Sequence, residues 1–337
     1  MSPPRQPRLR SRWAGVLVTA LALSVSGIPE ARGESALQQT FATPEAAVRA
    51  LVTATRALAN AGERAERRAA LEALAAVLGP ESGHVIRSGD RVADQQGRQR
   101  FLRAYAAAHA LEHPSEDKAI LTIGPEGWPM PIPLVKTGKR WRFDTAAGKD
   151  EILNRRIGRN ELRAIEICRA YVAAQRAYAE VPREGDGPPA YAQQFMSDPG
   201  KKNGLYWETP PGEEPSPMDP LVAQARAAGY GPRARESQPR PYYGYFYRII
   251  TAQGPEAPGG AVSYVVEGKM TGGFAMVAFP ARYGNSGVMT FLVNHQGTVY
   301  EKDLGPDSIT LGRGMRAYNP DSTWKEVAVP SGDAAAR

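Results

Sequence analysis

The chain of 337 residues contains a single cysteine, Cys168. One thiol cannot form an intramolecular disulfide, so packing and hydrogen bonds alone must hold the fold together. Ile165, Tyr171 and Val172 surround Cys168 at helical spacing, which places the thiol on an apolar helix face. Because burial in such surroundings raises the pKa of a thiol and suppresses its reactivity, we predict a core residue and not a nucleophile.

Long apolar runs are also scarce, and the longest lies near the N-terminus. Arginines precede an apolar stretch at residues 13–28, which is shorter than the ~20 residues of a membrane-spanning helix. Ala31 and Gly33 supply the small residues of a cleavage site before Glu34. We therefore predict a signal peptide over residues 1–33 and a bacterial protein that is exported, either periplasmic or secreted. The alternative is an uncleaved N-terminal anchor. No later run reaches spanning length, so we expect no stable membrane span after leader removal.

A strong excess of either charge is absent from the predicted mature chain. The formal net charge of +7 includes five arginines and one glutamate of the leader, whose removal leaves 37 basic and 34 acidic residues. No cluster of lysines and arginines interleaved with aromatics remains to bind a phosphate backbone. We therefore exclude nucleic acid as a partner.

The first half after the leader predicts helices followed by strands. Thr43 and Pro44 start a helix, with Pro44 at the first helical position. Residues 34–150 are therefore predicted to form an N-terminal α+β domain of helices plus a small antiparallel sheet. Further helices are predicted over 63–78 and 96–109, and strands over 119–123, 130–136 and 140–144.

The second half contains the clearest amphipathic helix, predicted over residues 160–180. A charged segment at 149–161 precedes it and is predicted to be a linker between the halves. Residues 151–327 are predicted to form a C-terminal α+β domain, a long helix packed on an antiparallel sheet, with a frayed tail at 328–337. A short helix is predicted at 220–228, and strands over 243–251, 264–266, 273–279, 288–294 and 298–301.

Several strings of sequence are distinctive and together suggest a family. They are FDTAAG at 143–148, NRRIGRNE at 154–161, GLYW at 204–207, TAQGP at 251–255 and YEKDLG at 300–305. With these motifs the chain resembles, over residues 40–325, the bacterial exported-protein family catalogued as domain of unknown function, number 2950. The resemblance implies export and supplies no activity.

The order of elements in the C-terminal half is similar to the headgroup of type IV pilin-like proteins, in which one helix packs on an antiparallel sheet. In pilins that helix continues an N-terminal membrane segment. Here it begins in the middle of the chain, after polar residues. The resemblance therefore implies the headgroup fold and argues against assembly into a pilus.

Motifs of known catalytic sites are incomplete. Ser322 and Lys325 match S-x-x-K, but they lie near the C-terminus where no long helix presents them. The K-T-G string at 136–138 precedes this pair instead of following it. The string at 284–287 lacks the final glycine of a G-x-S-x-G elbow. We therefore assign no catalytic residue, and the chain is more consistent with a protein that is not an enzyme.

Metal-binding patterns are incomplete as well. His109 and His113 are four residues apart, as metal ligands on a helix can be, but no third ligand has a suitable spacing. We expect these histidines to cap a helix end, where an imidazolium is favoured. Glu184 and Asp186 offer two carboxylates, whereas calcium prefers about six to eight oxygens. We predict a polar loop there, and we assign no metal site and no cofactor.

A cleft between the two predicted domains is the one place where the sequence suggests a ligand. Arginines in the charged segment would suit a carboxylate or a phosphate, and clefts between domains commonly bind ligands. Interdomain salt bridges and the solvated start of a helix are the other interpretation. The candidate ligand-binding residues are Asp144, Arg155, Arg156, Arg159 and Glu161.

Two functional hypotheses follow. The first is an exported cell-envelope protein that is not an enzyme and contacts an envelope protein or surface component through an aromatic C-terminal sheet. The second is a small-molecule-binding protein or hydrolase that uses the interdomain cleft or the helical N-terminal unit. A deep pocket with several ionisable groups favours the second hypothesis, and a contiguous exposed aromatic patch favours the first. The aromatic residues concerned are Tyr242, Tyr243, Tyr245, Phe246 and Tyr247.

Overall fold

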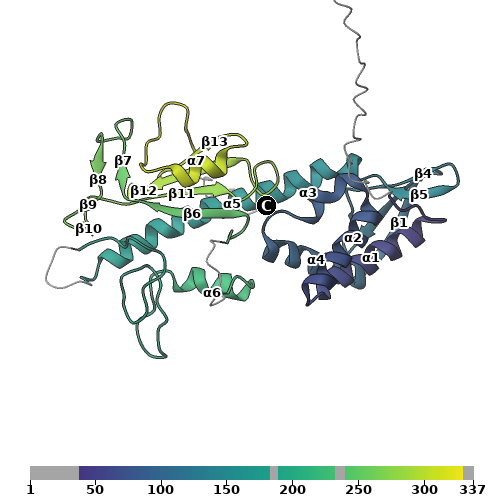
Figure 1. The fold of residues 1–337 in the computed structure, drawn as a ribbon, viewed down its shortest axis with the longest axis horizontal. Helices are drawn as coiled ribbons and strands as arrows, with labels where there is room; N and C mark the ends of the chain where they lie inside the picture. The colour runs from purple at the N-terminus through teal and green to yellow at the C-terminus, as the bar shows by residue number, and fades with distance from the viewer. Residues whose placement is uncertain (1–37, 183–188, 232–239, 329–337) are drawn as a thin grey trace, which may run out of the picture. The chain divides into compact units, whose positions relative to one another are not determined.

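The computed structural model describes residues 38–182, 189–231 and 240–328. The predicted signal peptide, the polar loop at Glu184 and Asp186, and nearly all of the predicted frayed tail lie outside these ranges. Within them, seven α-helices and several antiparallel sheets confirm the α+β class (Figure 1). No helix in the described ranges has the length and apolar character of a membrane span.

Helices α1 to α4 form where local signals favour them. Thr43 caps α1, because its Oγ1 accepts a hydrogen bond from the amide of Ala46 at 3.2 Å. Gly79 ends α2 with a φ of 88°, a backbone angle that favours glycine. Asp90 caps α4, which therefore begins earlier than predicted. The bounds are Pro44–Asn60 for α1, Arg64–Leu78 for α2, Gly83–Ile86 for α3 and Arg91–Ala107 for α4.

The two histidines that we considered together lie on a strand and not on a helix. α4 ends at Ala107 and β1 (His109–Ser115) follows, so His109 and His113 do not share a helix face. His109 nevertheless contacts the end of α4, because its Nδ1 lies 2.9 Å from the carbonyl oxygen of Tyr105. The capping interpretation is therefore confirmed for His109.

A small antiparallel sheet follows the first four helices. Its main path runs β1-β2-β4-β5, and β3 pairs with β2. The β4–β5 hairpin turns at Gly138, whose φ of 62° suits glycine. Leu121, Leu134 and Phe143 of this sheet are buried in one cluster with apolar residues of α1 and α2. The bounds are Lys118–Ile123 for β2, Trp128–Pro129 for β3, Leu134–Thr137 for β4 and Arg140–Phe143 for β5.

The predicted linker at 149–161 is helical, and this expectation was wrong. α5 is one continuous helix from Thr145 to Ala179. Charge alone does not interrupt a helix, and Glu151 and Arg155 form an i,i+4 ion pair of 2.5 Å within the segment. Gly148 is required at its position, since a Cβ there would lie 2.3 Å from the carbonyl oxygen of Pro131.

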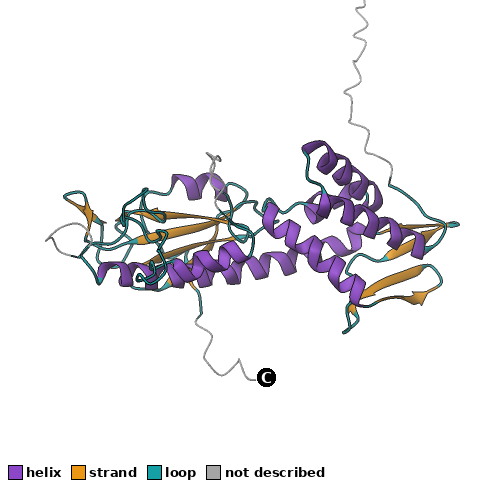
Figure 2. Cartoon of the chain, turned by 90° about the horizontal axis from the view of Figure 1, so that it is seen from below, coloured by secondary structure: helices purple, strands orange, loops and turns teal. Residues whose placement is uncertain are grey.

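The rest of the chain builds the predicted arrangement of a long helix on an antiparallel sheet. The sheet order is β14-β13-β12-β11-β6, with every residue of β11 buried. α5 contacts β11, β12 and β13, and both views show it running along this sheet (Figure 1, Figure 2). The bounds are Asp219–Ala227 for α6, Tyr245–Ile250 for β6, Ala275–Pro280 for β11, Met289–Asn294 for β12, Val299–Asp303 for β13, Ser308–Gly314 for α7 and Lys325–Glu326 for β14.

Two short ladders, β7 (Ala252–Gln253) with β8 (Val262–Ser263) and β9 (Val265–Val266) with β10 (Lys269–Met270), lie outside the main sheets. The sequence did not predict α7 or β14. The C-terminal half of α5 belongs to a second buried cluster that includes Tyr171, Tyr245 and Phe291. One helix thus carries side chains of both clusters, because Ile152, near its start, packs against the first.

Candidate functional site

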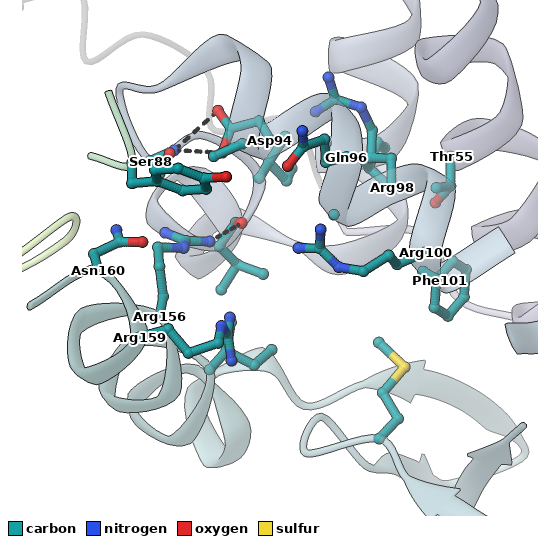
Figure 3. A pocket seen from close by; sticks show the side chains of 18 of the residues that line it. Thr55, Ser88, Asp94, Gln96, Arg98, Arg100, Phe101, Arg156, Arg159 and Asn160 are labelled. Atoms are coloured by element: carbon teal, nitrogen blue, oxygen red, sulfur yellow. Dashed lines mark hydrogen bonds between the residues drawn. The ribbon is translucent and has the colours of Figure 1, made fainter. Parts of the chain in front are cut away.

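A cavity of about 790 Å³ lies between α4 and α5, and we call it the α4–α5 cavity. Its floor comes from α1, α2 and α3, which contribute Leu51, Leu74 and Ile86. Helices α4 and α5 form its walls, and Figure 3 shows side chains from both walls pointing into it. This volume is in the range of sites for small organic ligands, about 300–1,000 Å³.

The cavity exists because α4 does not close onto its neighbours. None of the residues of α4 is fully buried, which is unusual for a helix that contacts α1. The lining positions Ala93, Gly97, Arg100 and Phe101 follow helical spacing and form one face. Two of them are small: a Cβ built at Gly97 would meet no heavy atom nearer than Arg100 Nη2 at 4.0 Å. The inner face of α4 therefore borders open space.

The opposite wall is one face of α5. Ile152, Arg156, Arg159, Asn160 and Arg163 are spaced as i, i+4, i+7, i+8 and i+11, so they lie on the same side of the helix. Two of the residues predicted for a ligand cleft, Arg156 and Arg159, are therefore brought together in this wall. Arg156 and Arg159 face the cavity together because the segment predicted to be a linker is helical.

The lining is rich in positive charge. The lining contains two carboxylates, Asp94 and Glu166, and a larger number of arginines. Glu166 is occupied by Arg163, whose Nη1 lies 2.7 Å from Glu166 Oε2. An excess of guanidinium groups therefore remains on the cavity wall. The arginines of the lining are Arg98, Arg100, Arg156, Arg159 and Arg163.

Arg156 is held by the protein itself. Its Nη1 donates to the carbonyl oxygen of His84 at 2.7 Å, and its Nη2 donates to that of Val85 at 2.7 Å. Nη1 also donates to Oδ1 of Asn285, a fully buried residue on the loop before β12. Burial lowers the pKa of Arg156, and the charge of Asp94 partly opposes this effect. Arg156 thus holds α5 to the segments around His84 and Asn285, and most of its donors are already used within the protein.

Asp94 is the half-buried carboxylate of the cavity. Both of its oxygens accept a hydrogen bond from the amide of Ser88, each at 3.1 Å. Burial raises the pKa of Asp94 above its ordinary value, while the hydrogen bonds from Ser88 and the charges of Arg156 and Arg98 act in the opposite direction. Its acceptors are already engaged with the backbone.

Arg100 and Arg159 differ from the other arginines of the lining. Among the described residues, neither guanidinium has a hydrogen-bond acceptor or a carboxylate partner. Figure 3 shows Arg100 of α4 directed toward the side of the cavity where Arg156 and Arg159 lie. Burial lowers the pKa of Arg159, and the positive charges of Arg100 and Arg155 lower it further. Two exposed guanidinium groups of like charge therefore share one opening.

Asp90 fixes the start of the α4 wall. Its Oδ1 accepts hydrogen bonds from the amides of Val92 and Ala93, both at 3.0 Å, and so caps the helix. Its Oδ2 accepts from the hydroxyl of Tyr230 at 2.7 Å and from the amide of Gly244 at 2.9 Å. One buried carboxylate thus joins α4 to two segments more than a hundred residues away.

The other three predicted ligand residues do not line the cavity. Asp144 lies at the N-cap position of α5, and its amide donates to the carbonyl oxygen of Pro133 at 2.8 Å. Arg155 pairs with Glu151. Glu161 Oε1 accepts from the amides of Val288 and Met289, at 2.9 and 3.0 Å. The last contact ties α5 to β12.

The sequence did not predict the residues that α4 contributes, Asp94, Arg98 and Arg100. Two small residues, Ala93 and Gly97, and the polar Arg100 on one helix face were the available signal, since a helix face that packs tightly carries larger apolar residues. Whether that face borders a cavity depends on α5, which follows in the chain only after the whole first sheet.

The aromatic residues of the C-terminal sheet are not a contiguous exposed patch. Tyr245 is fully buried, and Tyr242, Tyr243, Phe246 and Tyr247 are half-buried. Several pack on one another, with ring centroids of Tyr242 and Tyr243 4.6 Å apart. A second hollow of about 390 Å³ with a mostly apolar lining includes Tyr242, Phe246 and Tyr247.

Comparison with known proteins identifies a family, but no individual curated protein or solved structure that matches. The family model described as "Protein of unknown function (DUF2950)" matches residues 38–327. No curated protein and no solved structure matches the chain. The match covers every residue of the α4–α5 cavity, so the cavity lies within the part of the chain that is typical of the family.

Proposed function

The chain belongs to the DUF2950 family of proteins of unknown function, and we propose that it is an exported binding protein that holds a small anionic molecule in the α4–α5 cavity. One observation carries the proposal. Arg100 and Arg159 share the cavity opening and neither has an acidic partner among the described residues, whereas Arg163 is paired with Glu166.

A bound anion would satisfy both unpaired arginines. A guanidinium presents a planar set of donors that fits a carboxylate or a phosphate, and hydrogen bonds between charged groups are about twice as strong as neutral ones. The anion would also remove the repulsion by which Arg100 lowers the pKa of Arg159. Both effects favour binding of negative charge at this point.

The structure supports binding over hydrolysis. A general acid or base needs a carboxyl group that is free to reach a substrate. Asp94 instead accepts the amide hydrogen of Ser88, which is shared between its two oxygens, and Glu166 is paired with Arg163. The same cavity favours small-molecule binding over a contact surface, because it is a pocket with several ionisable groups, whereas the aromatic residues of the C-terminal sheet are buried or half-buried.

Export is proposed from the sequence of residues 1–33, with its arginines, apolar stretch and small-residue site. N-terminal sequencing of the protein from its own cells tests this part. A mature chain that begins near Glu34 supports export, and a full-length chain that fractionates with membranes contradicts cleavage. The likeness to pilin headgroups stays a prediction of fold alone.

Native mass spectrometry tests the binding proposal without knowledge of the ligand. Three forms are isolated gently from the native envelope: wild type, Arg100→Gln/Arg159→Gln, and the control Arg103→Gln/Arg155→Gln. The control removes the same charge from the same two helices outside the cavity lining. We expect a small-molecule mass on the wild type and the control, and its loss from the first variant. A mass retained by all three forms, or a bound polypeptide in its place, contradicts the proposal.

A further inference from the structure

The α4–α5 cavity has an apolar part that a simple anion would leave empty. Val85, Phe101, Met130 and Ile152 line it and are only half-buried, although each also packs against the first apolar cluster. A bare phosphate or carboxylate would occupy a small share of about 790 Å³. The remaining apolar surface would stay in contact with water, at a cost in free energy that an apolar ligand group removes.

Each of the two walls carries an apolar side chain at a distance from Arg159. On α4, Arg100 and Phe101 are adjacent in sequence, and Figure 3 shows Phe101 on the far side of Arg100 from Arg156 and Arg159. On α5, Ile152 and Arg159 are seven residues apart on one face, about 10 Å along the helix axis. On each wall an apolar side chain, Phe101 on α4 and Ile152 on α5, is thus displaced from Arg159.

We infer, on the basis of the proposed function, that the ligand is an anionic amphiphile, in which a charged group is joined to an apolar body. Arg100 and Arg159 hold the charged group, and the apolar body lies against Phe101, Met130 and Ile152. Carboxylate and phosphate head groups share this chemistry, since both accept from a guanidinium fork. Either could come from a free amphiphile or from the head group of a membrane lipid.

A chain-length series tests the inference. Butanoate, octanoate and dodecanoate, with octyl phosphate as a second head group, are titrated calorimetrically into the full mature protein below their micellar concentrations. We expect each added CH2 to raise affinity about twofold to fourfold until the apolar part is filled. An affinity that does not change with chain length overturns the inference.

A variant in the apolar part adds a second readout. Met130→Gln keeps the side-chain length but places an amide where the apolar body would lie. We expect it to lower dodecanoate affinity at least fivefold and to leave butanoate affinity unchanged. Met196→Gln is the matched control, since Met196 is 52% exposed and lies outside this cavity. Equal loss of affinity for both chain lengths, or no loss for dodecanoate, contradicts the inference.

The outcomes separate the inference from the proposed function. If Arg100→Gln/Arg159→Gln abolishes carboxylate binding while chain length has no effect, the inference fails and the proposed function stands. If chain length matters but the double variant binds normally, the proposed anion site is wrong. Co-sedimentation with vesicles of anionic phospholipid separates the sources. Binding to vesicles with no binding of free octanoate or octyl phosphate would reject a free amphiphile, and would assign the site to a lipid in its membrane.

Discussion

Arg100 on α4 and Arg159 on α5 share the opening of one cavity, and burial together with the charge of Arg100 lowers the pKa of Arg159. Like charges that face a common space destabilise the ligand-free protein. The proposed anion would lie between them and offset this repulsion, so replacing either arginine should weaken binding without lowering the stability of the ligand-free protein.

Arg159→Gln should leave the ligand-free protein as stable as the wild type or slightly more stable, by up to about 0.5 kcal/mol. The variant should also lose the stabilisation that a bound ligand provides. At a ligand concentration one hundred times Kd, the wild type gains about 2.7 kcal/mol. Thermal unfolding with and without octanoate measures both effects. Arg103→Gln is the control, and an equal ligand-induced rise in Tm for Arg159→Gln would contradict the assignment.

Asp94→Asn should change how stability depends on pH. Burial raises the folded-state pKa of Asp94 above its ordinary value of 3.8. The stability that this carboxyl contributes is therefore fully present below the unfolded pKa and is lost as the pH rises through the raised folded pKa. As the pH rises through this pKa, the wild type should accordingly lose stability relative to the variant. Denaturant midpoints measured over a series of pH values check this. Asp117→Asn, at an exposed turn, is the control. A wild type that gains stability relative to Asp94→Asn as the pH rises would contradict the raised pKa.

Asp90→Ala should be among the most destabilising single changes in the N-terminal helices. The carboxylate caps α4 and accepts from Tyr230 and Gly244 while only 1% exposed. Loss of a cap and of buried acceptors costs about 2–4 kcal/mol in unfolding free energy. Asp307→Ala serves as the comparison, because Asp307 precedes α7 without a side-chain capping bond. Equal effects of the two substitutions would show that the Asp90 contacts contribute little.

Glu161→Ala should destabilise the fold without changing ligand affinity. Glu161 Oε1 accepts from the amides of Val288 and Met289, so its loss leaves two donors without that acceptor, at about 1–3 kcal/mol. Glu161→Gln keeps an oxygen at this position and should lose much less. Denaturant unfolding and octanoate titration of both variants check the two statements. Weaker octanoate binding in a folded Glu161→Gln protein would instead place Glu161 at the ligand.

Cys168 should react with thiol reagents only in unfolded protein. Its side chain is fully buried, and burial raises the pKa of the thiol to about 12. Both the low thiolate population and the lack of access slow the reaction. Labelling with a maleimide before and after addition of denaturant measures this directly. Rapid labelling of the native protein would show that α5 moves away from the sheet.

The elements that the sequence predicted are those set by local signals. The cap at Thr43 and the apolar face of α5 from Ala164 onward need only neighbours within a few turns of helix. The first half of α5 was missed, because a charged segment without apolar periodicity was interpreted as a linker. β1 was missed for a related reason: its side chains are mostly exposed, so it lacks an alternating pattern.

The candidate site was only partly predictable. Arg156 and Arg159 were proposed as ligand residues because arginines suit anions, and both line the cavity. Their counterpart Arg100 comes from a helix that ends before the first sheet begins, and tertiary packing alone brings it opposite Arg159. Glu161 was also proposed as a ligand residue, but it does not line the cavity, and its carboxylate instead holds α5 to β12.

The most direct test of the account is calorimetric titration of octanoate into wild type, Arg100→Gln/Arg159→Gln and Arg103→Gln/Arg155→Gln. Loss of hydrogen bonds between charged groups at two positions should weaken binding at least about tenfold in the first variant. The control should bind within about twofold of the wild type. Such a result would support an anion site between α4 and α5. Equal affinities in all three proteins would contradict it.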